Sequence, residues 1–405
     1  MNRRAFVTGM GVTGMGVAGM GSLLAAQDKP EQPCLLATAE QVSKIRGALR
    51  PGQKALLGEL AGAAQKAGPW SVTAHRPAGL NISAGPHDYM SEGPYWWPDP
   101  KNPGGPYIRK DGQRNPARFM GNRDDLGKLC TAVLALGMGA ALLGQKDNTA
   151  HAETILRAWF LTPETRMTPN LEFGQIVRGV NEGRGTGLID TVSFIHLIQG
   201  AALLELAGGF DTTVSAGMRQ WFADFVKWMT TSPKGLDEKK SGNNHATWWT
   251  AQVATYAAFT KDSALQTMAW EHFRKTLVPG QIMPDGSCPR EEARTQSLSY
   301  SSMNLDAFSL VCRLAEMEGV DLWHFQTPEG IGTERAFRYL IPFVSRPGTW
   351  KKEQITRYDA GGYIFPGVAG AGLHAAELTE AYRQIPRPAA PWPQFTGLWC
   401  DVAEG

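Results

Sequence analysis

Apolar residues recur at three- and four-residue steps through most of the chain, which is the periodicity of amphipathic helices. Turns rich in Gly, Pro and Ser separate these segments at intervals suited to antiparallel helix pairs. Strand-like alternation is scarce, and residues 358–368 are the best candidate for it. The pattern predicts a mainly α fold of stacked helical hairpins, without an exact internal repeat. The predicted helices cover residues 126–144, 152–161, 189–208, 215–232, 246–260, 264–277 and 303–319.

One long segment, residues 82–119, interrupts the helical pattern and is rich in proline, glycine and aromatic residues. A disordered segment has few aromatic residues, whereas a long ordered loop in a compact domain is usually functional. We therefore predict a lid or cleft wall that presents rings and basic groups. These groups are Tyr89, Tyr95, Trp96, Trp97, Tyr107, Arg109, Lys110 and Arg114.

Composition narrows the class of protein. The chain has 405 residues, of which 42% are hydrophobic and 19% charged. Its net charge of +2 does not indicate nucleic-acid binding. Five cysteines without C-x-x-C spacing argue against a zinc site or a disulfide scaffold. Cys130 and Cys312 lie within apolar helical patterns, so we expect both to be buried thiols.

The N-terminal residues 1–26 read as an export signal. Arg3 and Arg4 precede Phe6 and an uncharged Gly/Ala/Val/Met run, and small residues end the segment at Ala25 and Ala26. The paired arginines and the glycine-rich run resemble the twin-arginine type of signal. We therefore predict a periplasmic or secreted protein, not stably inserted in a membrane after signal removal, with residues 27–405 as a single domain.

The stretch "SGNNHATWW" places two amides and a histidine at the predicted start of a helix. Free backbone amides and the positive end of the helix dipole favour an anion there and disfavour a protonated imidazole. His245 is therefore a candidate general base, and the Asn244 amide is a candidate donor to a substrate carboxylate. The alternative is that Asn243 or Asn244 only caps the helix and His245 only packs.

A second set of residues lies further along the chain, where Arg294 precedes Tyr300 and another apolar helix. Arginine binds a carboxylate through two parallel hydrogen bonds, and a tyrosine hydroxyl transfers protons when a cation lowers its pKa. Six residues correspond to ~600° of helix, so we expect Arg294 to precede the regular helix that carries Tyr300. As an isolated pair, they also fit a surface arginine and a tyrosine at the edge of the core.

Together these residue types describe one reaction. Removal of the proton α to a uronate carboxyl group, with loss of the glycosidic oxygen from the next carbon, needs carboxylate neutralisation, a base and an acid. Asn244 and Arg294 are candidates for the first task, and His245 and Tyr300 for the other two. The sequence thus indicates β-elimination by a polysaccharide lyase.

The stretches "NNHATWW" and "PHDYMSEGPYWWPDP", with Arg294 and Tyr300, resemble the alginate-lyase-like group of (α/α)-toroid polysaccharide lyases, most closely polysaccharide lyase family 38. The resemblance implies an (α/α) toroid, carboxylate binding by Asn244 and Arg294, proton transfer by His245 and Tyr300, and no metal or cofactor. It implies an anionic polyuronate, alginate or glucuronan, as the substrate. The segment 178–191 resembles a cleft-lining piece of the same proteins. The expected substrate-binding residues are Tyr89, Tyr95, Trp96, Trp97, Arg114, Asn181, Arg184, Asn243 and Trp248.

Two other classes of function stay open on the sequence. A glycoside hydrolase on a similar helical fold needs two opposed carboxylic acids, for which Asp88, Asp190, Glu291 or Glu292 are available. A carbohydrate-binding protein would keep the cleft without the chemistry. Only a lyase produces an unsaturated uronide that absorbs in the ultraviolet without adding water.

Overall fold

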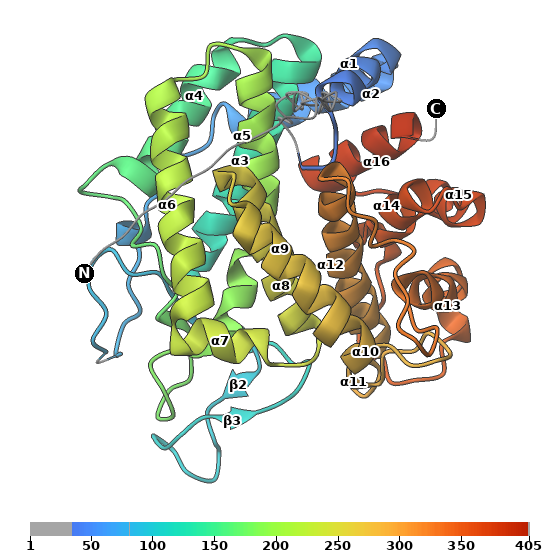
Figure 1. Cartoon of the computed structure of the whole chain (residues 1–405). Helices are drawn as coiled ribbons and strands as arrows, with labels where there is room; N and C mark the ends of the chain where they lie inside the picture. The colour runs from blue at the N-terminus through green and yellow to red at the C-terminus, as the bar shows by residue number, and fades with distance from the viewer. Residues whose placement is uncertain (1–34, 81, 404–405) are drawn as a thin grey trace, which may run out of the picture. The chain divides into compact units, whose positions relative to one another are not determined.

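The computed structural model describes residues 35–80 and 82–403, and the predicted export signal lies outside them. Within the described residues, contacts between helices run in a closed order from α3 to α5, α8, α12, α14 and α16 and back to α3. Figure 1 shows α3, α5, α8 and α12 as neighbouring long helices. The bounds of this inner ring are α3 (Gly121–Leu143), α5 (Phe194–Ala207), α8 (Asn244–Thr260), α12 (Ser297–Met317), α14 (Phe365–Gly372) and α16 (Pro391–Ala403).

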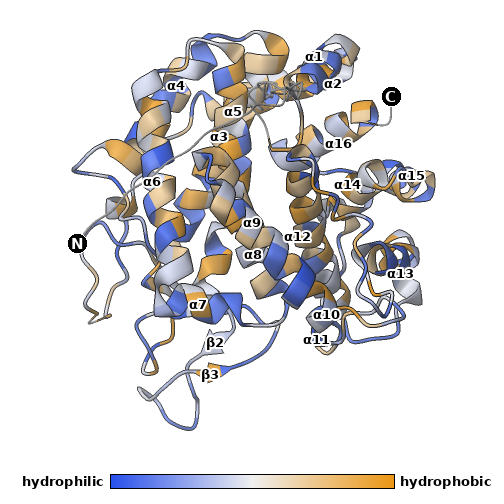
Figure 2. Cartoon of the chain, viewed as in Figure 1, coloured by the Kyte–Doolittle hydropathy of each residue, from blue (hydrophilic) through white to orange (hydrophobic). Residues whose placement is uncertain are grey.

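A second set of helices packs against the outside of the ring, each on an inner helix. Figure 2 shows hydrophilic and hydrophobic residues together on α6, as expected for a helix with one buried face. The outer helices are α1 (Ala39–Ala48), α2 (Pro51–Ala64), α4 (Asp147–Leu156), α6 (Thr212–Thr231), α9 (Ser263–His272), α13 (Thr333–Ser345) and α15 (Ala376–Gln384).

Short helical segments connect these elements. The short α-helices are α7 (Pro233–Lys239), α10 (Val278–Gln281) and α11 (Pro289–Glu292). Short segments of tighter or wider helix are η1 (Val72–Ala74), η2 (Arg157–Leu161), η3 (Gly185–Thr191), η4 (Phe273–Leu277), η5 (Pro347–Thr349) and η6 (Ala360–Gly362).

The inner helices are apolar because neighbouring helices cover them on most sides. The segments Gly121–Leu143 and Gly185–Ala207 are long and apolar enough to cross a membrane, but 78% of the apolar 18-residue stretch within each is buried inside the fold. Helices α3 and α5 approach closely at Gly137, where an added Cβ would lie 2.4 Å from the Gly200 carbonyl oxygen. Cys130 and Cys312 are fully buried, as the helical pattern predicts.

The predicted helices are confirmed, although several bounds differ. Helix α12 begins at Ser297 rather than near residue 303, since its first turns bury small polar residues that carry no apolar pattern. The expected strand over residues 358–368 is wrong. That segment contains the turn η6 and the start of α14, where Asp306 accepts hydrogen bonds from the backbone amides of Ile364 and Phe365. A buried aspartate side chain therefore caps a helix where alternation suggested a strand.

Strands in the described residues are short, and all but β4 belong to the segment that interrupts the helices. β1 (Met90–Glu92) pairs in parallel with β4 (Phe173–Ile176), and β2 (Trp96–Trp97) pairs antiparallel with β3 (Ile108–Arg109). Figure 1 shows the β2–β3 hairpin below α7. Residues 82–119, called the lid here, are thus ordered by backbone hydrogen bonds both within the segment and to the segment around β4.

Candidate active site

A cavity of about 460 Å³ lies where the lid meets the starts of α8 and α12. Its wall contains six arginines, and Asp359 is the only carboxylate among the described lining residues. This balance predicts an anionic ligand with more than one negative charge. The lining residues are Pro94, Tyr95, Trp96, Arg109, Arg114, Arg123, Gln175, Arg184, Thr186, Ile189, Ser241, Asn243, Asn244, His245, Arg294, Gln296, Ser299, Tyr300, Met303, Thr356, Arg357, Asp359 and Tyr363.

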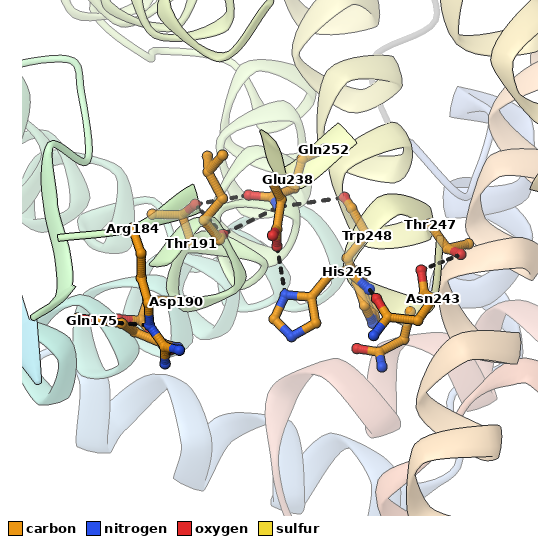
Figure 3. Close-up of polar contacts among 12 residues, drawn as sticks. Gln175, Arg184, Asp190, Thr191, Glu238, Asn243, His245, Thr247, Trp248 and Gln252 are labelled. Atoms are coloured by element: carbon orange, nitrogen blue, oxygen red, sulfur yellow. Dashed lines mark hydrogen bonds and ion pairs between the residues drawn. The ribbon is translucent and has the colours of Figure 1, made fainter. Parts of the chain in front are cut away.

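The first turn of α8 places His245 on this wall. Asn243 is the N-cap, and its side-chain oxygen accepts a hydrogen bond from the His245 backbone amide at 3.1 Å. Gly242, at φ 69°, supplies the left-handed turn that leads into the cap. Figure 3 shows the His245 ring between Glu238 and the open space in front of Arg184. The expected helix start is confirmed, and the cap and the histidine are both cavity residues.

The orientation of the His245 ring is set by Glu238 at the end of α7. Nδ1 lies 2.6 Å from the Glu238 carboxylate, and the two side chains are 19% and 1% exposed, respectively. Burial raises the pKa of Glu238, while the nearby histidine acts in the opposite direction. With Nδ1 engaged, Nε2 is the ring nitrogen left for a ligand, and the carboxylate stabilises the charge that the ring gains with a proton. The sequence argument from the helix dipole missed this partner.

Asn244 is fully buried, although it also contributes to the cavity wall. Its backbone amide and its side-chain Nδ2 both donate to the Glu291 carboxylate, the latter at 2.7 Å. Its Oδ1 has no hydrogen-bond partner in the described structure. Burial raises the pKa of Glu291, and the hydrogen bonds from Asn244 oppose that effect. Asn244 therefore ties the start of α8 to α11, in addition to any contact with a ligand.

On the other wall, Arg294 and Tyr300 form a stacked pair. The guanidinium carbon of Arg294 lies 3.7 Å from the centroid of the Tyr300 ring. Arg294 lies between α11 and α12, before the regular helix that carries Tyr300, as the spacing predicts. The Tyr300 hydroxyl is hydrogen-bonded to the hydroxyl of Tyr95 from the lid. Burial, followed by the proximity of Tyr95, raises the pKa of Tyr300, so the hydroxyl retains its proton at neutral pH.

A lid carboxylate occupies one edge of Arg294. Asp111 accepts from Nε at 3.0 Å and from Nη2 at 2.8 Å, and from the Thr295 hydroxyl at 3.1 Å. Burial alone would raise the pKa of Asp111, but the hydrogen bonds and charge of Arg294 lower it to about 2. The Nε–Nη2 edge that would bind a carboxylate bidentately is therefore already used within the protein.

The structure divides the expected substrate-binding residues into two groups. Tyr95, Trp96, Arg114, Arg184 and Asn243 line the cavity, whereas the other expected residues do not.

Each residue off the cavity wall has a different structural environment, which corrects its expected position. Tyr89 is buried and donates to Asp190 at 3.2 Å, and Trp248 is buried within α8. Trp97 packs under Lys110 and donates to the Gln113 carbonyl. Asn181 accepts from the backbone amides of Val177 and Gly183 and so closes a turn. The aromatic or amide character of these residues did not indicate whether each side chain lines the cavity.

The carboxylates considered for a glycoside hydrolase do not line the cavity. Asp190 and Glu291 are buried acceptors of internal hydrogen bonds, and Glu292 pairs with Lys352. Asp88 accepts from the Gly85 backbone amide. A pair of opposed acids is therefore missing from the described wall, and a hydrolase mechanism with two acids is not supported.

Sequence reasoning missed several residues that shape the site. Asp111 and Glu238 lie in charged stretches where nothing in the sequence distinguishes them from other acids. Tyr363 comes from the segment that was expected to form a strand, Arg357 lies just before that segment, and Gln175 comes from β4. No local sequence pattern distinguishes these residues, because each reaches the site through contacts with residues far away in the sequence.

The sequence matches the family model of alginate lyases over residues 72–350, more than half of the chain. The chain belongs to the alginate lyase family. It is a polysaccharide lyase. A comparison with curated proteins found no match to the sequence.

Solved structures agree with this family. A crystal structure of an alginate lyase from Bacteroides ovatus shares 34% identity, with a TM-score of 0.82, over 88% of this chain and 96% of that chain. Alginate lyase A1-III from Sphingomonas species A1 shares 15% identity, with a TM-score of 0.59, over 91% and 94% of the two chains. A variant of A1-III complexed with a tetrasaccharide shares 16% identity, with a TM-score of 0.59, over 86% and 90%. The predicted (α/α) toroid is confirmed, whereas the assignment to family 38 stays a prediction.

Proposed function

We propose that this lyase cleaves a 1,4-linked polyuronate by β-elimination and leaves an unsaturated uronide at the new chain end. The observation that carries the proposal is the arginine-rich cavity with His245 and Tyr300 on its wall. A polyuronate carries one carboxylate on each sugar, so a wall with six arginines and one carboxylate matches its charge. Trp96 adds an aromatic ring for a sugar face.

The reaction requires two proton transfers and no water. A base removes the proton on C5, the C–H electrons form the C4–C5 double bond, and the C4–O4 bond breaks as an acid protonates O4. Negative charge builds on the carboxyl group as the C5 proton leaves, so cationic groups there stabilise the transition state more than the ground state.

We assign His245 as the base and Tyr300 as the acid. The Nε2 atom of His245 is available because Nδ1 is held by Glu238, and a buried carboxylate behind the ring stabilises the imidazolium that forms. Tyr300 has a raised pKa and keeps its proton for the leaving oxygen. Arg294, stacked on the ring, stabilises negative charge on the tyrosine oxygen as that proton leaves.

Stereochemistry connects these roles to the choice of uronate. In guluronate the C5 proton and O4 lie on opposite faces of the ring, which suits a base and an acid on different walls. In β-mannuronate and β-glucuronate they lie on the same face, so Tyr300 would have to take the first proton and return it. We therefore expect the second group of substrates to react only if Tyr300 loses its proton when substrate binds.

The test is a panel of pure polyguluronate, polymannuronate and glucuronan, followed by ultraviolet absorbance and by reducing-end release. A lyase raises both signals together, a hydrolase raises only the reducing ends, and a binding protein raises neither. New reducing ends without ultraviolet absorbance on any member of the panel would overturn the β-elimination mechanism.

We propose polysaccharide lyase family 38 as the finer family assignment.

We also propose that residues 1–26 are a twin-arginine-like export signal, so that the mature enzyme acts in the periplasm or outside the cell. Support for the signal comes from the paired arginines and the uncharged glycine-rich run that follows them. Fractionation of cells that produce the full chain or an Arg3→Lys, Arg4→Lys variant would test it. Equal export of both would contradict a twin-arginine signal.

A further inference from the structure

Arg184 is held on the cavity wall by one residue, Gln175 in β4. The Arg184 side chain donates to the Gln175 backbone oxygen from Nε at 3.2 Å and to the Gln175 side-chain oxygen from Nη2 at 2.6 Å. Gln175 in turn donates from its side-chain nitrogen to Asp190 at 3.2 Å and from its backbone to Ser91 at 2.8 Å. Figure 3 shows Arg184 beside Gln175, across the open space from His245. The guanidinium is thus fixed by a buried network behind the cavity wall.

The backbone of Gln175 is unusual. Its φ is 53°, one of few positive values at residues other than glycine in the described chain. This left-handed conformation is unfavourable for glutamine and persists only where surrounding contacts hold it. Here the same residue gives both its carbonyl and its side-chain oxygen to one guanidinium. Backbone strain of this kind at a cavity wall is typical of a functional position.

Arg184 has no carboxylate within ion-pair distance among the described residues, although most of its side chain is buried. Asp190, the nearest acid in the network, is paired with Arg123 at 3.1 Å and also accepts from Tyr89 and Ser91. Burial and the neighbouring Arg109 lower the pKa of Arg184. The charges of Asp190 and Glu238 act in the opposite direction, but neither carboxylate pairs directly with Arg184, so an anion that enters the cavity would stabilise this buried cation.

Space around Arg184 is also arranged for close packing. Trp96 presents its ring 5.7 Å from the guanidinium carbon. At Gly93, an added Cβ would lie 2.6 Å from the Trp96 ring and 3.1 Å from Nη2 of Arg184, so a glycine is needed there. Arg184 and Arg294 both have Nε and Nη2 engaged within the protein, but the partner of Arg294 is the carboxylate of Asp111, whereas the partner of Arg184 is the uncharged Gln175.

We propose that Gln175 is a positioning residue that holds Arg184 to bind a carboxylate of the bound polyuronate, on the wall opposite His245. The proposal rests on the proposed function for the class of ligand. Arg184 keeps Nη1 free of protein partners, so one edge of the fork is available to a carboxylate. Asn244 and Arg294, which the sequence favoured for this task, are both engaged by internal carboxylates.

The experiment compares Gln175→Asn, Gln175→Gly and Arg184→Ala with the wild type. Asparagine and glycine tolerate positive φ but are too short to reach the guanidinium. We expect KM for the polyuronate to rise on the order of tenfold in the Gln175 variants, with kcat changed less, and to depend less steeply on salt. Arg184→Ala should show a larger rise.

A double-mutant cycle separates positioning from general stability. If Gln175 acts through Arg184, the Gln175→Asn change has little effect on KM when Arg184 is already alanine. His374→Gly is the matched control, since His374 also has a positive φ, 52°, but is exposed and does not line the cavity. It should leave KM and its salt dependence unchanged.

Unchanged KM in both Gln175 variants, or additive effects in the cycle, would overturn the proposal. Calorimetric titration with a non-cleaved polyuronate oligomer distinguishes this failure from failure of the proposed function. If the wild type binds the oligomer but forms no unsaturated product from any polymer of the panel, the lyase mechanism fails, and weaker binding by Gln175→Asn still supports the positioning role. If the wild type does not bind any polyuronate, both proposals fail.

Discussion

Two walls of the cavity can be compared: the α8 wall, which carries His245, and the lid wall, where Arg294 and Tyr300 meet the lid. Each wall pairs a candidate proton-transfer residue with a carboxylate, but the two walls are held in different ways. His245 is backed by Glu238, which is 1% exposed and belongs to a helix packed on the ring. Tyr300 is backed by Tyr95 and, through Arg294, by Asp111, and both of these residues come from the lid. The α8 wall is thus held by the helical core, whereas the lid wall depends on contacts from the lid.

The largest effect should come from removing the proton-transfer groups themselves. His245→Ala and Tyr300→Phe should each lower kcat by on the order of 10² or more while the fold stays intact. His324→Ala and Tyr339→Phe are matched controls, because neither residue lines the cavity. Initial rates of ultraviolet absorbance and circular dichroism would measure both properties. Near-normal turnover in either site variant would remove that residue from the mechanism.

Arg294→Lys tests whether the lid wall needs a planar guanidinium. A single ammonium cannot contact both Asp111 oxygens and stack on Tyr300, so we expect a loss in kcat of ~10² although the charge is kept. Arg335→Lys, at an exposed arginine outside the cavity, is the control. If Arg294→Lys retains most of its kcat, the stacked geometry does not contribute to the chemical step.

Glu238→Gln addresses the α8 wall. Glutamine still offers an oxygen to Nδ1 of His245, so the ring keeps its orientation, but the charge that stabilises the imidazolium is lost. We expect kcat to fall on the order of tenfold, with KM unchanged, as for loss of a carboxylate behind a catalytic or ligating histidine. Steady-state kinetics would check this split. A rise in KM alone would mean that Glu238 affects binding rather than proton transfer.

Asp111→Asn should loosen the lid wall without touching the α8 wall. The pKa of Asp111 is lowered to about 2, so its ion pair with Arg294 contributes fully above its unfolded pKa of about 4 and is lost as pH falls through the folded value. The variant should therefore differ from the wild type by a similar factor, a few-fold in kcat/KM, at every pH from about 5 to 9. Proteolysis of the lid should also be faster. A difference that appears only at one end of this range would contradict the assignment.

The smallest effect separates the two lid tryptophans. Trp96 lines the cavity and Trp97 does not, so Trp96→Ala should raise KM a few-fold while Trp97→Ala changes it less. Ring stacking acts on ground and transition states alike, so kcat should change little in the first variant. Equal effects of the two substitutions would show that the lid acts as a unit rather than through the one ring that lines the cavity.

The sequence by itself determined the helices and the residues at their starts. Apolar periodicity is a local signal, so it located the long helices, and the Asn-Asn-His stretch identified the cap and the histidine of α8. The spacing of Arg294 and Tyr300 placed the arginine before the helix for the same reason. Resemblance to a known family then connected these residues to one reaction and one fold.

The tertiary structure alone decided the partners of those residues. Glu238, Glu291 and Asp111 are ordinary acids in charged stretches, and each acquires its role only because the ring of helices or the seated lid places it against a particular side chain. The sequence also could not predict where the side chains of Tyr89 and Trp97 point, because an irregular loop has no periodicity from which to tell a buried face from an open one. Long-range contacts, which depend on how the closed ring forms, fix the electrostatics of this site.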